Sequence, residues 1–483
     1  MAFRVTTAEV VFLVALLATY GVAIFARRRS ARDGNGGLAE MRFNRWLVGL
    51  SAGTTASSGV IATGSVALGY TVGLKSLVLS IGWLLGELVF WYVFPARINR
   101  VGRESQATTV SDVLTYKLSG SASSLLGMLC GLIILVCLTG FLSVQWLAGQ
   151  KFLSGAFGVP GTTALGLFAL LIVGYSSIGG FRGSVYTDVL LAIIRIAGSI
   201  IALVAIVWFA MHDRTSFSKN IATAGTGFMS MHFGGIAGTA GFMFGMAVAA
   251  VCFGLGQPQL FTRFLAGRSP EETRSAWWIY IGFAQFTWIS MMVFGALLRG
   301  VMPGIADPES GLRIFFQTNT NAVLMGLILT HVFATNAAAS NGLLITIAQT
   351  ITHDLIPCVH RGWNIRRSLL IATLLMGLVS VLVSISTHGS AYNLALASMP
   401  LMGAGLAAAM MIKVLGWRHS AASLLCAAVG GIFVAVLWQQ LGLGSYLYEA
   451  GIGTAGGLVI NWLAIKFWRG TTPVARRPQQ STL

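Results

Sequence analysis

The chain has 483 residues, of which 55% are hydrophobic and only 9% are charged, and its mean hydropathy is +0.79. Soluble domains are about 25% charged, so this composition excludes a soluble globular protein and indicates an integral membrane protein. The formal net charge of +17 would suggest nucleic-acid binding in a soluble protein, but here the basic residues flank apolar segments, which excludes that explanation.

Apolar runs of about 20 residues predict membrane-spanning helices. Thirteen such runs follow one another, at residues 8–27, 44–71, 75–98, 120–152, 160–180, 184–211, 235–258, 272–300, 313–352, 367–387, 392–414, 419–441 and 446–467. The fourth and ninth runs are long, which predicts bent or tilted helices. The connecting segments are too short for a soluble catalytic domain. The sequence therefore predicts an all-α polytopic membrane protein of about 13 helices that is not an enzyme.

Lysine and arginine residues concentrate in alternate connecting segments. If the N-terminus lies outside, most of the 31 basic residues face the cytoplasm, as the positive-inside rule requires. This predicts an N-out, C-in protein of a bacterial inner (plasma) membrane. Its expected partners are the lipid bilayer and a small-molecule substrate, with no nucleic acid, and its oligomeric state stays open between a monomer and a homodimer. No Walker A motif occurs, which argues against an ATP-driven pump.

Five stretches in this order resemble the sodium/solute symporter family, which includes proline permeases and bacterial sugar, sialate and pantothenate carriers. They are FNRWLVGLSAGTTASSGVIATGSVALGY at 43–70, PARINRVGRESQATTVSDV at 95–113, IGGFRGSVYTD at 178–188, GQPQLFTRF at 256–264 and LLITIAQTITHDL at 343–355. The resemblance implies a LeuT-type architecture with two inverted five-helix repeats, made of helices 2–6 and 7–11. Substrate then sits at the membrane midplane between broken helices.

The resemblance also implies a domain organisation. Residues 1–43 form an extra N-terminal helix and the first cytoplasmic loop, 44–211 the first repeat and 235–414 the second repeat. Residues 415–467 form two peripheral helices, and 468–483 form a polar tail that is expected to be disordered.

Small and hydroxyl residues interrupt the second apolar run at 51–59, SAGTTASSG. Such residues let a helix unwind inside a membrane because side chains can satisfy the freed backbone groups. The freed N–H groups can hold an anionic substrate group and the freed carbonyls a cation. Alternatively, the small residues serve only tight helix packing. A second break is expected near Gln257, because Pro258 lacks a backbone donor.

The candidate substrate-binding residues lie near these two breaks and on the fourth helix. Gln145 offers two donors and an acceptor, and Trp146 a flat apolar wall. Ala250 stands where many relatives have an aromatic residue, which would leave room for a bulkier substrate or a different gate. The set is Thr54, Thr55, Ser58, Phe141, Gln145, Trp146, Ala250 and Gln257. The alternative for the pocket residues is plain core packing.

The resemblance further implies a sodium site made of backbone carbonyls on the second helix and hydroxyl groups on the ninth. The matching positions here are Thr54, Ser57, Ala338, Asn341 and Gly342, and Ser340 is a neighbouring hydroxyl. These residues offer few oxygen ligands, so the site is interpreted as degenerate. Sodium is doubtful and no cofactor is expected.

Arg195 lies seven residues after Asp188 in the sixth run, about 10 Å further along the same helix. An arginine inside a membrane is a candidate functional residue by default. Three interpretations stay open: a fixed cation in place of sodium, a ligand for a substrate carboxylate, or a structural residue that either pairs with Glu87 or Asp188 or snorkels to the membrane surface. Because arginine does not release its proton, proton coupling would require Glu87, Asp188 or His331. His331 is otherwise a satisfied residue of the helix bundle.

These observations predict a secondary active transporter that imports a small organic solute, amino-acid-like or a carboxylate, by alternating access. Coupling to protons or independence of sodium is expected. Two alternatives stay open: a sodium-coupled symporter with a rebuilt site, and a non-transporting sensor or scaffold that keeps the transporter fold.

Overall fold

The computed structural model describes residues 6–32, 42–231, 235–356, 362–386, 390–445 and 447–467, which are almost entirely helical. The expectation of a disordered tail at 468–483 lies outside these residues. The α-helices are α1 Thr7–Arg32, α2 Arg45–Ala56, α3 Gly59–Val72, α4 Ser76–Val93, α5 Pro95–Ser105, α6 Val110–Thr115, α7 Ser121–Phe157, α8 Gly161–His212, α9 Arg214–Thr223, α10 Gly235–Leu255, α11 Pro258–Leu265, α12 Pro270–Ser275, α13 Trp277–Val301, α14 Gly311–Asn319, α15 Ala322–Gln349, α16 Ile365–Ser386, α17 Ser390–Val414, α18 Ala421–Gln440 and α19 Glu449–Phe467.

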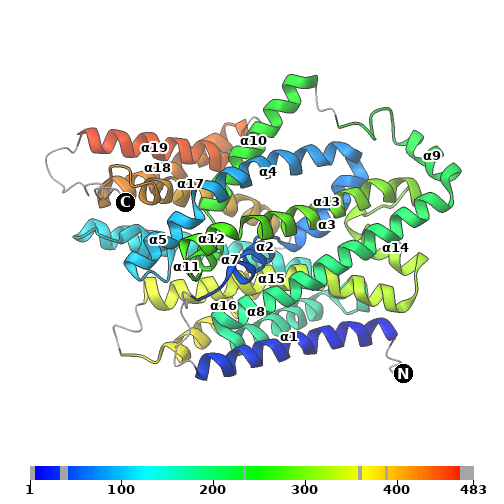
Figure 1. The fold of residues 1–483 in the computed structure, drawn as a ribbon, viewed down its shortest axis with the longest axis horizontal. Coiled ribbons are helices and arrows are strands. Elements are labelled where there is room, and N and C mark those ends of the chain that lie inside the picture. The colour runs from blue at the N-terminus through cyan, green and yellow to red at the C-terminus, as the bar shows by residue number, and fades with distance from the viewer. Residues whose placement is uncertain are drawn as a thin grey trace.

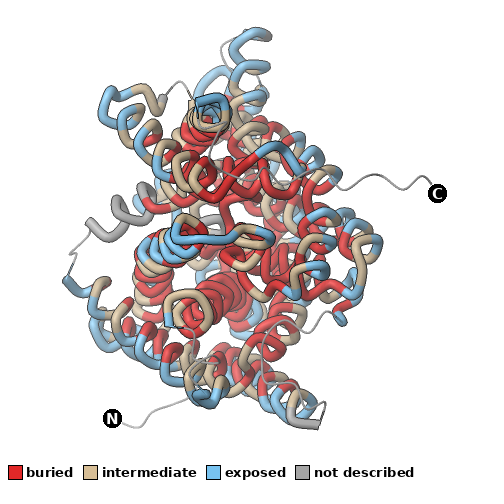
Figure 2. Tube along the Cα trace, turned by 90° about the vertical axis from the view of Figure 1, so that its left-hand side faces the viewer, coloured by how far each residue is buried: buried red, intermediate tan, exposed pale blue. Residues whose placement is uncertain are grey.

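The long helices run alongside one another, with α1 at one edge and α18 and α19 at the opposite edge (Figure 1). Viewed end-on, buried segments fill the interior of the bundle and exposed segments surround it (Figure 2). In the described residues, ten helical stretches are long and apolar enough to span a membrane, and Ser398–Val414 is a shorter apolar helix. Two of the ten, Thr63–Ser105 and Gly161–His212, run through more than one predicted span. Every predicted span therefore has a helical counterpart, and the chain is a multi-pass membrane protein.

Two predicted boundaries differ from the structure. The run at 75–98 ends early, because α4 stops at Val93 and Pro95 opens the separate helix α5, as expected for proline in a first turn. The run at 313–352 holds two helices, α14 and α15, separated at Thr320 and Asn321. The Asn321 side chain accepts a hydrogen bond from the backbone N–H of Leu324 and caps α15.

The first helix of each predicted repeat is broken, as expected from the sequence. α2 ends at Ala56, and Ser57 and Ser58 are extended (φ −92°, ψ 108° and φ −78°, ψ 163°) before α3 begins at Gly59. α10 ends at Leu255, Gln257 is extended (φ −107°, ψ 93°), and Pro258 starts α11. α11 packs against α2, so the two broken helices are neighbours.

α8 contains both the fifth and the sixth predicted spans. It is interrupted at Gly180, whose φ of 59° and ψ of −157° are not helical. Positive φ is readily adopted by glycine because it has no Cβ atom. The Ile-Gly-Gly stretch thus turns the chain between the two spans and sets the direction of the helix that carries Asp188 and Arg195.

The Thr-x-x-Asp stretch of the second motif caps α6. Thr109 Oγ1 accepts a hydrogen bond from Asp112 N at 3.2 Å, and Asp112 Oδ2 accepts one from Thr109 N at 3.1 Å, which is a capping box. Asp112 also lies 3.1 Å from His353 Nε2, beyond the end of α15. Burial raises the pKa of the Asp112 carboxyl, but hydrogen bonds from His353 and from the backbone of Thr108 and Thr109 oppose it, and the pKa ends below its ordinary value.

Close backbone contact joins α3 to α13. A Cβ atom at Gly69 would lie 2.0 Å from the carbonyl oxygen of Met292, and one at Gly295 would lie 2.1 Å from that of Val66. Because main-chain atoms are the obstacle, the two helices can only accommodate a larger residue by moving apart.

We expect Gly69→Ala to destabilise the protein by about 1–3 kcal/mol, the usual cost of overpacking. The measurement is the thermal unfolding midpoint in detergent. Gly282→Ala on α13 is the matched control, because nothing lies within 4 Å of its added Cβ atom. Equal midpoints for the two variants would show that the α3–α13 contact is looser than described.

Candidate substrate and cation site

Asp188 is fully buried and belongs to a network that links α8, α2 and α11. Its Oδ2 accepts hydrogen bonds from Ser51 Oγ at 2.7 Å and Thr55 Oγ1 at 3.1 Å. Arg263 Nη2 lies 3.3 Å from the same oxygen and forms an ion pair with it. Asp188 therefore has a partner on α11 that holds the two broken helices to α8.

Arg263 lies in the basic segment that follows the run at 235–258, and the structure buries its side chain. Its side chain is 1% exposed and donates to Ser184 Oγ at 2.7 Å and to the carbonyl of Gln259 at 3.1 Å. The sequence signal for a special role of Arg263 is the Gly-Gln-Pro motif, which ends in Arg-Phe at 263–264. Counting charges along the sequence cannot find this ion pair, because a basic residue next to an apolar run has the same sequence pattern whether its side chain faces water or a buried acid.

Asn341, a residue of the predicted sodium site, is buried and its amide is hydrogen-bonded. Its Oδ1 accepts from Ser176 Oγ at 2.8 Å, and its Nδ2 donates to Ser184 Oγ at 3.0 Å. A Cβ atom at Gly342 would lie 2.4 Å from Thr55 Cγ2, so α15 is pressed against α2 here. Ala338 beside them is fully buried and contributes no side-chain oxygen.

The hydroxyl groups nearest this site bond to protein atoms. Thr54 Oγ1 donates to the carbonyl of Leu50, and Ser57 Oγ donates to that of Gly53. Ser340 Oγ donates to the carbonyl of Asn336, one turn earlier on α15. Each of these hydroxyl groups uses its proton in the bond and keeps its oxygen lone pairs, so the bonds fix its orientation but do not exclude a cation.

Arg195 is 2% exposed, and its guanidinium lies over the ring of Phe283, 4.9 Å from the centroid. Its Nε and Nη1 atoms have no hydrogen-bond partner among the described residues. The interpretation in which Arg195 pairs with Glu87 or Asp188 is not what the structure shows, because in the part of the chain that is described both acids bond elsewhere. A cation–π contact recovers only part of the cost of burying a charge.

His331 and Ser199 are neighbours of Arg195. His331 packs against α8 from α15, and Ser199 lies one turn after Arg195 on α8. His331 Nδ1 is 3.2 Å from the carbonyl oxygen of Arg195, and a Cβ atom at Gly198 would lie 2.5 Å from His331 Cβ. His331 Nε2 and the Ser199 hydroxyl are buried and, within the described residues, have no partner. Both therefore keep hydrogen-bonding capacity, one on α8 and one on α15, which packs against it.

Glu87 is buried between α4 and α13. Its Oε1 accepts from Trp83 Nε1 at 3.1 Å and its Oε2 from Gln285 Nε2 at 2.9 Å. Ser80 Oγ donates to Gln285 Oε1 at 2.6 Å and extends the network. Glu87 is thus satisfied by neutral donors and is separate from the Asp188–Arg263 pair.

Gln145 and Asn336 meet at the break between α2 and α3. The backbone N–H of Gly59 donates to Gln145 Oε1 at 3.3 Å, and a Cβ atom at Gly59 would collide with Asn336 Oδ1, 1.4 Å away. Gln145 Nε2 and Asn336 Oδ1 are buried without a partner among the residues described. Gln145, which was predicted as a substrate-binding residue on the fourth helix, therefore contacts the first helix break.

Other predicted pocket residues pack inside the protein. Trp146 is fully buried and donates from Nε1 to Ser380 Oγ at 2.8 Å, and Phe141 packs against the same core. Ala250 contacts α4, since a Cβ atom at Gly86 would lie 2.7 Å from its Cβ. The space expected at Ala250 is therefore taken up by α4.

Gln257 and Ser58 lie at the two helix breaks themselves. Gln257 is 1% exposed, accepts a hydrogen bond from Gln259 and contacts Met399 Sδ at 3.7 Å. Ser58 is the N-cap residue of α3, and its side chain does not cap the helix. Both positions are buried and stay candidates for substrate contact.

Solved structures with the same arrangement of helices are transporters. A Na+-coupled sialic acid symporter in a substrate-bound outward-open state matches with a TM-score of 0.80 and 18% identity, covering 97% of this chain and 98% of that one. MhsT in complex with L-phenylalanine matches with a TM-score of 0.53 and 15% identity over 87% of this chain and 99% of its own. Mhp1, a nucleobase-cation-symport-1 family transporter, matches with a TM-score of 0.53 and 12% identity over 92% and 97%. At these identities the likeness shows the fold, which is of the LeuT type.

Sequence comparison extends this likeness to a family. The high-affinity proline transporter PutP of Bacillus subtilis (strain 168) is 24% identical over 470 residues, which cover 91% of this chain and 93% of PutP. The profile of the sodium:solute symporter family matches residues 38–416, which is well over half of the chain and includes both helix breaks and the Asp188–Arg263 pair. The chain therefore belongs to the sodium:solute symporter family.

Proposed function

We propose that this secondary active transporter carries a small carboxylate, such as an amino acid, by alternating access and without sodium. The observation that carries the proposal is the buried Arg195 guanidinium with its unpartnered Nε and Nη1 atoms. A buried cation without an anion is costly, so a substrate that brings a carboxylate to it would gain a strong, two-pronged hydrogen bond.

The surroundings of Arg195 support a polar substrate. Among the described residues, Asn336 Oδ1 and Gln145 Nε2 are unpartnered at the first helix break. Ser199 Oγ on α8 and His331 Nε2 on α15, which packs against α8, are unpartnered as well. Buried polar atoms are nearly always hydrogen-bonded in proteins. A cluster of unpartnered ones is therefore typical of a site that a polar ligand completes.

The degenerate cation site supports independence of sodium. The Asn341 amide, which bonds to Ser176 and Ser184, stands where the family resemblance implies a hydroxyl ligand. Ala338 and Gly342, at the other matching positions of the ninth helix, have no side-chain oxygen. Arg195 supplies a permanent positive charge that could do the electrostatic work of the missing ion. Both functional interpretations of Arg195, as a fixed cation and as a carboxylate ligand, are compatible with transport that is independent of sodium. They differ in whether the guanidinium contacts the substrate.

The test is uptake into proteoliposomes with sodium or potassium as the only alkali cation. The probes are radiolabelled amino acids and short carboxylates, beginning with proline because PutP of B. subtilis is a proline transporter. We expect the initial uptake rates in the two salts to agree within about twofold. Removing an ion that transport requires would lower the rate by far more than this. Liposomes without protein are the control.

A rate that falls more than about tenfold in potassium would favour the alternative, a sodium-coupled symporter with a rebuilt site, as the likeness to the Na+-coupled sialic acid symporter suggests. If no probe is taken up or exchanged while one of them raises the melting temperature, the chain is a sensor rather than a carrier, since a ligand that binds only the native state stabilises it.

A further inference from the structure

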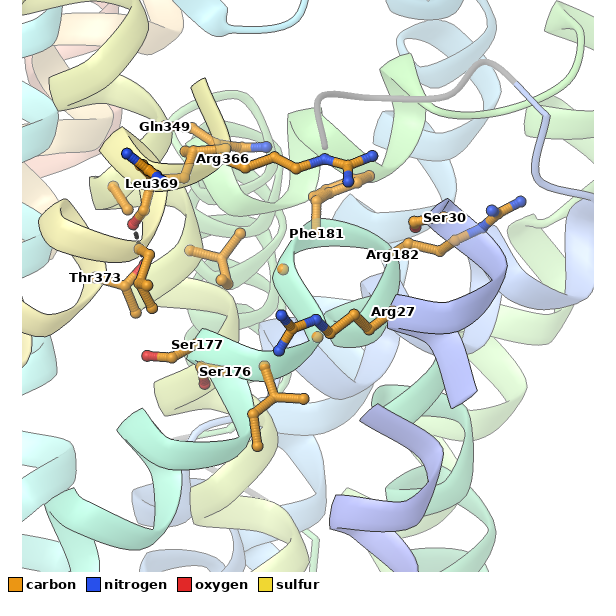
Figure 3. A pocket seen from close by; sticks show the side chains of 17 residues that line it. Arg27, Ser30, Ser176, Ser177, Phe181, Arg182, Gln349, Arg366, Leu369 and Thr373 are labelled. Atoms are coloured by element: carbon orange, nitrogen blue, oxygen red, sulfur yellow. Dashed lines mark hydrogen bonds between the residues drawn. The ribbon is translucent and has the colours of Figure 1, made fainter. Parts of the chain in front are cut away.

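A cavity of about 500 Å³ lies between α1, α8, α15 and α16, and its wall includes Gly180, where α8 is interrupted. Figure 3 shows the side chains that line it, drawn from all four helices. Four of the lining residues are arginines: Arg27, Arg182, Arg366 and Arg367. None of the described residues that line the cavity is acidic, so the guanidinium groups make this wall basic and favour an anion.

Buried amide and hydroxyl groups complete the polar wall. Gln349 is 1% exposed, and in the described part of the chain neither its Oε1 nor its Nε2 has a hydrogen-bond partner. The Ser177 hydroxyl, also in the wall, is likewise buried and unpartnered among those residues. An amide nitrogen and a hydroxyl that both lack partners beside a set of arginines are suited to an anion that accepts several hydrogen bonds.

The cavity opens next to a surface that faces lipid. Along α16, Leu370 at its rim is 41% exposed, followed one and two turns later by Leu374 at 49% and Leu378 at 58%. These residues lie on one face of the helix because they are four residues apart. The arginines stand at the end of the bundle that the charge distribution assigns to the cytoplasm.

We infer that this cavity binds the phosphate of an anionic phospholipid headgroup, with the acyl chains lying along α16. Basic pockets between transmembrane helices on the cytoplasmic side suit such headgroups. The arginines supply charge, Gln349 and Ser177 supply hydrogen bonds, and the exposed leucines supply the apolar surface that a free phosphate ion would not need. This inference is independent of the proposed substrate and of its coupling.

The test uses the purified full-length protein in detergent with phosphatidylglycerol, phosphatidylcholine or sodium phosphate, and native mass spectrometry to measure bound lipid. We expect phosphatidylglycerol to bind at least about tenfold more tightly than phosphatidylcholine. In the double variant Arg27→Gln/Arg367→Gln this preference should fall to about twofold or less, since two favourable charges are lost. A second variant, Gln349→Leu, should weaken the binding of phosphatidylglycerol although it leaves the charge of the cavity unchanged.

The matched control is Arg28→Gln/Arg29→Gln. It also removes two positive charges, but both come from the end of α1 next to Arg27 and from residues that do not line the cavity. It should keep the lipid preference. An equal loss of preference in the control, or equal binding of both lipids by the wild type, would overturn the inference. So would a thermal stabilisation by sodium phosphate that phosphatidylglycerol cannot increase, because the ligand would then be a soluble phosphate.

Discussion

Arg195→Met is expected to lower substrate uptake by about 30-fold to 5,000-fold, the range that corresponds to losing 2–5 kcal/mol from one partner of a buried charged pair. The same variant should unfold at an equal or higher temperature than the wild type. The reason is that Nε and Nη1 of Arg195 have no hydrogen-bond partner among the described residues, so that methionine removes a buried charge that is only partly compensated. The measurements are initial uptake rates and the thermal unfolding midpoint.

Arg195→Lys separates the two functional interpretations. Lysine keeps the positive charge but lacks the planar fork that binds a carboxylate through two hydrogen bonds. Uptake that survives in the lysine variant would favour a fixed cation, and uptake that is lost would favour a carboxylate ligand. Arg299→Met is the control, because Arg299 also lies over an aromatic ring, that of Tyr70 at 5.1 Å, but near the end of α13. Wild-type uptake in Arg195→Met would leave Arg195 a structural residue and refute the proposed role.

Arg263→Met is expected to destabilise the protein by about 3–5 kcal/mol, because it leaves Asp188 charged and buried without its ion-pair partner. Asp188 is fully buried and Arg263 1% exposed, so water cannot replace the lost contact. The double variant Arg263→Met/Asp188→Leu should recover most of this loss, since both charges are then gone. The measurement is the denaturant or thermal unfolding midpoint of all three proteins in the same detergent.

The control for this cycle is Lys151→Met. Lys151 pairs with Glu309 at 3.3 Å, but the two side chains are 77% and 46% exposed. An exposed pair of this kind contributes about 0–1 kcal/mol, so its loss should hardly move the midpoint. If Arg263→Met behaves like Lys151→Met, the pair between α8 and α11 does not hold the broken helices together.

Much of the architecture could be predicted from local sequence. Apolar runs mark the spans because every residue facing lipid must be apolar over the thickness of the bilayer. The breaks at Ser57 and Gln257 were foreseen because small residues and Pro258 weaken a helix wherever it packs. The turn at Gly180 falls inside the Ile-Gly-Gly stretch of the third motif. The need for a glycine there follows only from its positive φ in the structure. These features depend on a few neighbouring residues, so the chain by itself determines them.

The partners of the charged groups were decided by the tertiary structure. Asp188 bonds to Arg263, 75 residues later, while Arg195 on the same helix has no ionic partner among the described residues. The basic cavity joins Arg27 of α1 to Arg367 of α16, 340 residues later in the chain. Sequence periodicity shows which face of a helix a residue occupies, but not which helix will lie against that face. A buried charge is stabilised or left uncompensated by whichever group the packing places within a few ångströms, because in a low-dielectric interior the interaction depends steeply on that placement.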